Sequence, residues 1–577
     1  MRIDTRRWLL LPAIVALVAT GCGGDDDSDD SGSKDSKPVT EASIDQGTEG
    51  DLGNPVVGGT LTIGLEAETD SWLPGTGSFG NAGTTVAIAI YDPLVARTAD
   101  GDVQPYLAES VEPNATFDVW TLKLRPDIKF HDGTSLTAQV LKSIFDEYLT
   151  APTSNTAGVL AGVTMKVVDD LTVEYRLEQG NSAFLDLLIN SPGWPFSVEA
   201  AKKHGEDAGA NPVGTGPFVF DSWTRDGELR VTRNESYWKT DADGSRLPYL
   251  DAVVFKPITD ENTRVASLES GGIDAMQTLR QSTVAAVRDL AESGDGFKAF
   301  EWLGNNAGVS IINTYKAPFD DVRVRRALAY ALDQDQLIEV LGGTGITPRQ
   351  TQYFSADSPY YSEDAAEAWP NNDPDQAKQL LDEYVNDPER SDGLAPGTPV
   401  SFTYSCPPDP SLVELSQAYQ AFWQNVGFEV DLEALEQSEL IAQALGLDSD
   451  PLLAGTYDVQ CFRLGSENDP YTELSNSFGD WTTNSLNFTN FVDPLIDSRL
   501  EVLRGTDDLE TRKAAVEKIS LLLAEQVPNT WTGSTATSVG VRSAVKNMTG
   551  WTMPDGTAGS GVSSAVIRTV QVWIDES

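Results

Sequence analysis

The hydrophobic and polar positions change their period along the chain, and this change predicts a mixture of strands and helices. Apolar and polar residues alternate at 61–65 and at 172–177, which is typical of strands. Apolar residues recur at helical spacing at 324–332, 377–381 and 514–523, and aspartates that suit a helix start precede the first two of these segments. The chain therefore has the pattern of an α/β protein.

The first apolar run, residues 8–19, is typical of an export signal, because basic residues precede it and it is too short to span a bilayer comfortably. Small residues follow and lead to Cys22. This arrangement resembles the lipobox of bacterial lipoproteins, with Ala19 where leucine is usual. The resemblance implies that residues 1–21 are a signal peptide and that an acylated Cys22 ties the mature protein to the cell membrane. The alternative is an ordinary secretory signal followed by a coincidental cysteine.

Residues 22–54 form an acidic segment rich in Asp, Ser and Gly. Such a segment has too few apolar side chains to offset the entropy of folding, so we predict a disordered tether. As a flexible coil its reach is on the order of 30 Å, which is enough to hold a folded body away from a membrane surface.

The chain has a strong excess of acidic residues, with 40 Lys+Arg against 88 Asp+Glu and a formal net charge of -48. This charge repels nucleic acid and anionic lipid and argues against both as partners. An acid excess is most often a solubility or salt adaptation, so it names no ligand. The body after the tether exceeds the size of one hydrophobic core, so two or more domains are expected.

The sequence offers no catalytic, cofactor or metal site. It contains neither a GxxxxGK[ST] phosphate loop nor a GxSxG nucleophile elbow. The glycines at 75–80 have dinucleotide-binding spacing, but Pro74 precedes them and no strand runs into them, so a loop is predicted. His131 and His204 are the only histidines, and we interpret His131 as a turn residue. We therefore predict a protein that is not an enzyme and that has no cofactor and no metal.

Two cysteines remain once Cys22 is assigned to lipid. Cys406 follows a strand-like run and Cys461 lies within another. If these strands are neighbours in one sheet, the two thiols are close enough for a disulfide, which an extracytoplasmic location permits. We predict this disulfide; the alternative is two separate buried thiols.

Four groups of motifs, in order along the chain, resemble the extracellular solute-binding proteins of family 5, which serve peptide and nickel importers. The matching segments are 91–95, 105–110 and 122–134, then 214–218, then 233–238 and 247–251, and finally 318–328 with 331–333. Within these motifs, we expect His131, Asp132, Arg323 and Arg325 to fix the geometry of the domains rather than to touch solute.

The resemblance implies a two-lobed α/β protein with the type II fold of periplasmic binding proteins and an extra domain. The first lobe would combine residues 55–88, 206–296 and 527–577, with 89–205 as the added domain, and the second lobe would be 297–526. The lobes would close around a ligand through a hinge, because the ligand contacts both lobes only in the closed state.

The resemblance also implies the function of a lipid-anchored, monomeric substrate-binding component of an ABC importer. It would capture an oligopeptide or similar small solute and deliver it to a membrane permease and its ATPases. One alternative is a receptor for a non-peptide solute such as a sugar. Another is a cell-surface structural or sensor lipoprotein without a transport role.

Peptide binders of this family hold the α-amino group of the peptide with an acidic residue shortly before an Asp-Pro pair, which here is Asp469 with Pro470. One alignment places Ser466 at the position of the acid, and another places Glu467 there. Arg463 is expected to grip a carboxylate in the bidentate manner. Further candidates for solute binding are the aromatic and amide side chains of Trp302, Asn305, Asn306, Trp481 and Asn484. Nickel is disfavoured, because neither histidine falls in these segments.

Overall fold

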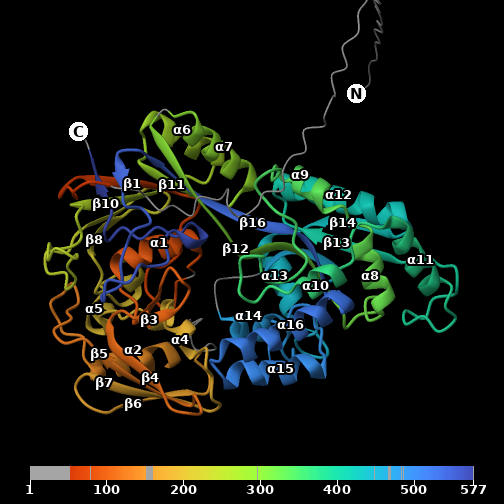
Figure 1. Ribbon diagram of the computed structural model, residues 1–577, viewed down its shortest axis with the longest axis horizontal. Helices are drawn as coiled ribbons and strands as arrows, with labels where there is room; N and C mark the ends of the chain where they lie inside the picture. Colours follow the sequence, from red (N-terminus) through yellow and green to blue (C-terminus); the bar gives the residue numbers. More distant parts are fainter. Residues whose placement is uncertain are drawn as a thin grey trace, which may run out of the picture.

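The computed structural model describes residues 52–575 apart from 78, 151–159, 295, 447–448, 465–468, 483 and 485. For residues 305, 306 and 464 it describes the backbone alone. Two lobes lie side by side, and one sheet runs through both (Figure 1). We use the terms first lobe, added domain and second lobe for the ranges predicted above. Within the described residues, no helix has the length and apolar character needed to cross a membrane.

The shared sheet has ten strands in the order β14-β13-β15-β12-β16-β11-β1-β10-β9-β8. Its longest strands, β12 (Phe297–Ile312) and β16 (Asn529–Arg542), pair antiparallel and cross between the lobes (Figure 1). Their register shifts between Leu303 and Ala307. An irregularity of this kind bends and twists a strand, which suits the place where two lobes meet.

The first lobe is built around β1 (Thr60–Leu65), which lies between the parallel strands β10 and β11, so the predicted strand at 61–65 is confirmed. Helices α6 and α7 pack together above the sheet at the top of Figure 1. The other elements of this lobe are α1 (Asn81–Ile90), β8 (Phe218–Trp223), β9 (Leu229–Arg233), β10 (Ala252–Pro257), α6 (Glu261–Ser270), β11 (Ala275–Thr278), α7 (Gln281–Glu292), β17 (Val545–Lys546) and β18 (Trp573–Ile574).

The second lobe covers both faces of its part of the sheet with helices, and each face has its own apolar cluster. Asp321 caps α8 and Asp373 caps α11, so both predicted helix starts are confirmed, and the third predicted helix is α16. The helices are α8 (Val322–Tyr330), α9 (Gln334–Val340), α10 (Glu363–Ala368), α11 (Pro374–Val385), α12 (Pro410–Val426), α13 (Gln437–Leu445), α14 (Pro470–Phe478), α15 (Pro494–Gly505) and α16 (Leu509–Gln526). The strands are β13 (Ser401–Cys406), β14 (Glu429–Ala434) and β15 (Val459–Leu464).

The added domain has a separate antiparallel sheet in the order β4-β5-β7-β6, and the predicted strand at 172–177 is its β7. Helix α2 packs on β6 and β7, and a short hairpin of β2 and β3 precedes the sheet. The elements are β2 (Val95–Arg97), β3 (Val103–Pro105), β4 (Ala108–Pro113), β5 (Val119–Leu124), α2 (Ala138–Thr150), β6 (Val163–Val167), β7 (Thr172–Leu177), α4 (Phe184–Leu187) and α5 (Val198–His204).

The family motifs of the first lobe and the added domain meet at His131. Its backbone N–H donates to the carbonyl of Gly214 at 2.9 Å. Its Nε2 donates to the carbonyl of Gly216 at 3.0 Å, and the side chain of Asn234 donates to the same carbonyl. Because these contacts join three motifs and use the histidine for backbone hydrogen bonds, His131 has the architectural role that the sequence predicted.

Burial shifts the pKa values of two groups in these motifs in opposite directions. Burial lowers the pKa of His131 to about 4, and its Nδ1 has no hydrogen-bond partner among the described residues. Burial also raises the pKa of Asp92 to about 7, although Trp238 and Tyr237 donate hydrogen bonds to its carboxylate at 2.8 and 2.9 Å. Protonation of the folded protein is thus resisted at His131 and favoured at Asp92.

We expect His131→Gln to change how the free energy of unfolding depends on pH, because the contributions of His131 and Asp92 to it have opposite pH dependence. Between its folded pKa and its ordinary value, His131 binds fewer protons when folded, so its contribution to stability is lost as pH falls. Asp92 binds more protons when folded, so its contribution is lost as pH rises towards about 7. When the pH falls from 7 to 5, the wild type should therefore lose up to about 2 kcal/mol more unfolding free energy than the variant without His131.

Urea unfolding at pH 7 and pH 5 measures this difference. His204→Gln, at the end of α5, is the matched control for the replacement of a histidine outside the motifs. A His131→Gln variant that follows the wild-type profile would contradict the prediction.

Cys406 and Cys461 lie on the neighbouring strands β13 and β15, which confirms the expected arrangement of these strands. Their Cα atoms are 5.2 Å apart, a distance that a disulfide spans. The bond itself remains a prediction. It would join two strands at the centre of the second lobe.

If the bond forms, reduction should lower the free energy of unfolding by about 2 kcal/mol, because the cross-link restricts the unfolded chain. A thermal melt with and without reducing agent measures the effect. Thiol counting on the denatured, unreduced protein is the control, and two reactive thiols in the protein lacking Cys22 would show that the bond is absent.

Candidate functional site

A cavity of about 900 Å³ lies between the two lobes. The β2–β3 hairpin and α4 supply its wall on the side of the added domain, and residues 560–563 lie beside them. Residues 302–304 of β12 supply the part at the crossover, and segments 354–360 and 507–512 supply the second-lobe wall. A volume of this size is within the range of pockets that enclose small-molecule ligands.

The wall of the cavity combines aromatic rings with a surplus of carboxylates. Five aromatic side chains line it: Phe117, Trp120, Trp302, Phe354 and Tyr360. The charged side chains are two arginines, Arg97 and Arg512, and six aspartates, Asp100, Asp102, Asp186, Asp357, Asp469 and Asp507. Aromatic rings offer contact area at low entropic cost, and the carboxylates favour a ligand with ammonium groups.

Both arginines of the wall already hold an aspartate. Arg97 Nη2 lies 2.9 Å from Asp186 Oδ1 within the added domain. Arg512 forms an ion pair with both carboxylate oxygens of Asp469, and the backbone N–H of Asp469 donates to Asp186. Burial raises the pKa of Asp186, and the charge of Arg97 opposes this effect. One network therefore connects the added domain to the second lobe.

The added domain and the second lobe also meet beside this network, at Ser182. Its backbone N–H donates to the carbonyl of Arg504, and its hydroxyl donates to the carbonyl of Leu503, both at 2.9 Å. Arg504 in turn donates from Nη1 to the carbonyl of Gly180 at 3.0 Å. Because these contacts cross from the added domain to the second lobe, they close the cavity on this side.

A second contact between the lobes joins two helix starts. Arg280, at the N-terminus of α7, forms a bidentate ion pair with Asp409, which caps α12. The Nη2–Oδ2 distance is 2.9 Å and the Nη1–Oδ1 distance is 3.2 Å. Both residues follow the carboxyl ends of strands, β11 and β13, which is where α/β folds place their ligands.

Two further charges lie near one another at such strand ends. Glu66 follows β1 of the first lobe, and Arg463 is an exposed residue near the end of β15 of the second lobe. Burial raises the pKa of Glu66, and the charges of Arg264 and Arg463 oppose this effect. Among the described residues, neither Glu66 nor Arg463 has an ion-pair partner within 4.0 Å. One lobe thus presents a carboxylate and the other a guanidinium, an arrangement that suits a zwitterion.

The predicted site residues have different places in the structure. Trp302 lies on the cavity wall. Trp481 is buried and meets Tyr315 edge-on, with ring centroids 5.2 Å apart. Asn484 donates to the carbonyls of Ser475 and Asn476, so its amide holds the end of α14. Five more of the predicted residues have little or none of their structure described.

For Asn305 and Asn306 the structure describes only the backbone, within β12. Cys22, Ser466 and Glu467 lie outside the described residues. Sequence reasoning missed Arg97 and Asp186 on the cavity wall and Glu66 near Arg463, because no motif or spacing marks them. Among the described residues, no group of three or more His, Cys, Asp or Glu is arranged to hold a metal ion.

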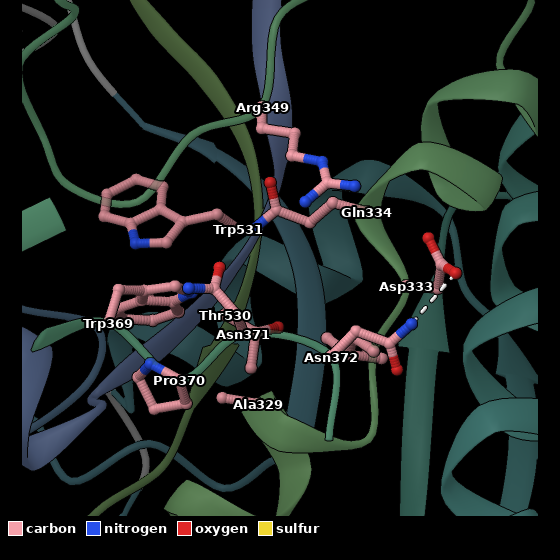
Figure 2. Close-up of a pocket in the computed structure, with 11 residues that line it drawn as sticks. Ala329, Asp333, Gln334, Arg349, Trp369, Pro370, Asn371, Asn372, Thr530 and Trp531 are labelled. Carbon is pink, nitrogen blue, oxygen red and sulfur yellow. Dashed lines mark hydrogen bonds between the residues drawn. The ribbon is translucent and has the colours of Figure 1, made fainter. Parts of the chain in front are cut away.

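A second pocket, in the second lobe, is too small for a solute. Its volume is about 20 Å³, enough for about one water molecule. Figure 2 shows the rings of Trp369 and Trp531 on one side and the hydrogen bond from Asn372 to Asp333, of 3.0 Å, on the other. Trp531 Nε1 is buried without a hydrogen-bond partner among the described residues. This pocket is therefore not a candidate solute site.

Comparison with known proteins identifies the family to which this chain belongs. Residues 102–485 match the family of bacterial extracellular solute-binding proteins, family 5, in its middle region. The chain belongs to this family. The predicted family is therefore confirmed, and with it the expectation of an extracytoplasmic binding protein that is not an enzyme.

Two relatives and one solved structure illustrate the similarity. The glutathione-binding protein GsiB of Salmonella paratyphi A is 26% identical over 495 residues, which cover 82% of this chain and 88% of the relative. The di/tripeptide-binding protein 2 of Pseudomonas aeruginosa is 26% identical over 498 residues, which cover 81% and 88%.

The solved structure is the periplasmic binding protein DppA of Helicobacter pylori in complex with the peptide STSA. It has a TM-score of 0.70 at 20% identity, and the match covers 90% of this chain and 99% of DppA. The predicted two-lobed α/β fold of family 5 is thus confirmed.

Proposed function

We propose that this family 5 protein captures a short peptide between its lobes and delivers it to the permease of an ABC importer. The interlobe cavity of about 900 Å³ carries this proposal, because both lobes and the added domain contribute to its wall. Two relatives are named for peptide ligands, glutathione and di- or tripeptides, which supports a peptide rather than a sugar.

Free peptides are zwitterions, and the cleft offers groups of both signs. Arg463 would bind the C-terminal carboxylate in a bidentate manner. Glu66 would attract the α-amino group from the other lobe, together with Glu467 or the hydroxyl of Ser466 in the second lobe. Trp302 would pack against the peptide from the crossover strand. A ligand that contacts both lobes stabilises the closed state.

Titration calorimetry with a tripeptide and with its C-terminal amide tests this assignment. The wild type should bind the free carboxylate about tenfold more tightly than the amide, because a charge-assisted hydrogen bond is lost in the amide. The Arg463→Ala variant should bind both peptides alike. Arg225→Ala, in the turn after β8, should behave as the wild type. Binding of sugars in place of every peptide would overturn the proposal.

The lipid anchor completes the proposed function. Acylation of Cys22 would hold the binding protein, a monomer, near its permease at the cell membrane. We expect Cys22→Ala to move the protein from the membrane fraction to the soluble fraction without changing its affinity for peptide. Equal membrane retention of wild type and variant would overturn the anchor.

A further inference from the structure

We infer that the interlobe cavity selects peptides with a cationic side chain, because both of its walls present carboxylates that a cation brings together. The inference rests on the proposed peptide-binding function. It concerns the side chain of the ligand, whereas Glu66 and Arg463 concern the termini of the peptide.

The first step is the balance of charge on the cavity wall. Six aspartates face two arginines, and no lysine lines the cavity among the described residues. Arg97 is held by Asp186 and Arg512 by Asp469. Within the described residues, Asp100, Asp102 and Asp507 form no ion pair with either arginine of the wall. An anionic ligand group would meet repulsion there, whereas a cationic group would be attracted.

The second step is that the acidic hairpin is held in place. The tip of β2–β3 carries Asp100 and Asp102, both exposed. Thr98 N–H donates to the carbonyl of Asp102 at 2.9 Å, and Ala99 N–H donates to the carbonyl of Ala558 at 3.0 Å. Because the turn is fixed at both its ends and against the C-terminal segment, its carboxylates are preorganised and binding need not order them.

The third step is an unused polar group beside these carboxylates. Thr98 lines the same cavity, is 3% exposed, and its hydroxyl has no hydrogen-bond partner among the described residues. Buried hydroxyls are normally hydrogen-bonded, so this oxygen is available to a donor on a ligand. An ammonium or guanidinium group supplies several such donors and satisfies the hydroxyl together with the carboxylates.

The fourth step is that the carboxylates come from both sides of the cleft. Asp100 and Asp102 belong to the added domain, and Asp507 belongs to the second lobe, between α15 and α16. Closure places these like charges around one cavity, where screening by salt is weaker than in open solvent. A cation bound between them removes this repulsion only in the closed state, so it shifts the equilibrium towards closure.

The test uses four tripeptides that differ only at the middle position: Ala-Ala-Ala, Ala-Met-Ala, Ala-Lys-Ala and Ala-Glu-Ala. Methionine matches the length of lysine without its charge. Calorimetry should give an affinity for the lysine peptide on the order of tenfold above the methionine peptide, and the weakest affinity for the glutamate peptide. The advantage of lysine should shrink when salt is raised from 50 to about 300 mM.

The Asp100→Asn/Asp102→Asn double variant should lose most of the lysine advantage and keep its affinity for the methionine peptide. The control variant Glu429→Gln/Asp431→Asn removes two charges from β14, at the outer edge of the sheet, and should keep the lysine advantage. Thermal melts of both variants check that they are folded.

Two negative outcomes are distinguishable. If no peptide binds, the proposed function fails and this inference fails with it. If all four peptides bind with equal affinity, or if both double variants keep the lysine advantage, peptide binding stands and the charge selection is overturned. Small-angle scattering adds a second readout, because the lysine peptide should produce more of the compact form than the methionine peptide at equal concentration.

Discussion

We expect the Arg512→Ala variant to lose about 3–5 kcal/mol of unfolding free energy. Arg512 is 3% exposed, and its Nη1 donates to the carbonyls of Leu503 and Thr506 at 2.6 and 2.9 Å. Its Nη2 is paired with Asp469, which lies against Asp186. Removal of the guanidinium leaves two neighbouring carboxylates with less compensating charge, and an uncompensated buried charge is costly.

Denaturant unfolding measures this loss. Lys513→Ala is the matched control, since Lys513 is the next residue of α16 and pairs with Glu510 on the surface at 3.2 Å. Its effect should stay below about 1 kcal/mol. Because Arg512 also donates to Ser182 of the added domain at 2.9 Å, the alanine variant should in addition close less readily on ligand. Equal unfolding midpoints for the two variants would refute the assigned role.

The second large effect is expected at Gly216, where we predict that Gly216→Ala costs about 3 kcal/mol of unfolding free energy. A Cβ at this position would lie 2.6 Å from the carbonyl carbon of Ile90, 2.7 Å from its oxygen and 2.9 Å from the carbonyl oxygen of Ala89. All three are backbone atoms at the end of α1, so no side chain can turn aside to make room. The loop must then move away from the helix.

A shift of this loop should also disturb His131, which donates to the carbonyl of Gly216. Thermal and denaturant melts of Gly216→Ala measure the loss of stability. Gly505→Ala is the control, because a Cβ there meets no atom within 4 Å at the end of α15. If the two alanine variants unfold at the same denaturant concentration, the close approach to α1 is not a constraint.

Much of the fold followed from signals that act over a few residues. The alternation at 61–65 predicted β1, and the aspartates before α8 and α11 marked the starts of these helices correctly. Capping and alternation depend on neighbours along the chain, so the sequence carries them in full. The position of His131 in a turn was predicted for the same reason, and the motif that contains Gly216 helped to identify the family.

The site was predicted less completely. Trp302 was proposed because a family likeness placed it near the crossover into the second lobe; it lines the cavity, and its contact with solute stays a prediction. Arg97 and Asp186, in contrast, are ordinary charged residues in the sequence, and nothing in their neighbourhood marks one as the partner of the other. Arg463 was proposed as a carboxylate-binding residue because it lies in the segment before the Asp-Pro pair. Its proximity to Glu66, in contrast, depends on how β15 and β1 are placed in one sheet.

The sequence by itself determined the class of this protein, an α/β chain with the ordered motifs of family 5, whereas its lipobox-like leader stays a prediction. Only the tertiary structure decided which charges meet. Arg512 and Ser182 are 330 residues apart in the chain, and they touch because two separately packed lobes dock across a cavity. Sequence patterns report local periodicity and short-range preference, whereas the charge balance of a cavity is a sum over segments that only docking brings together.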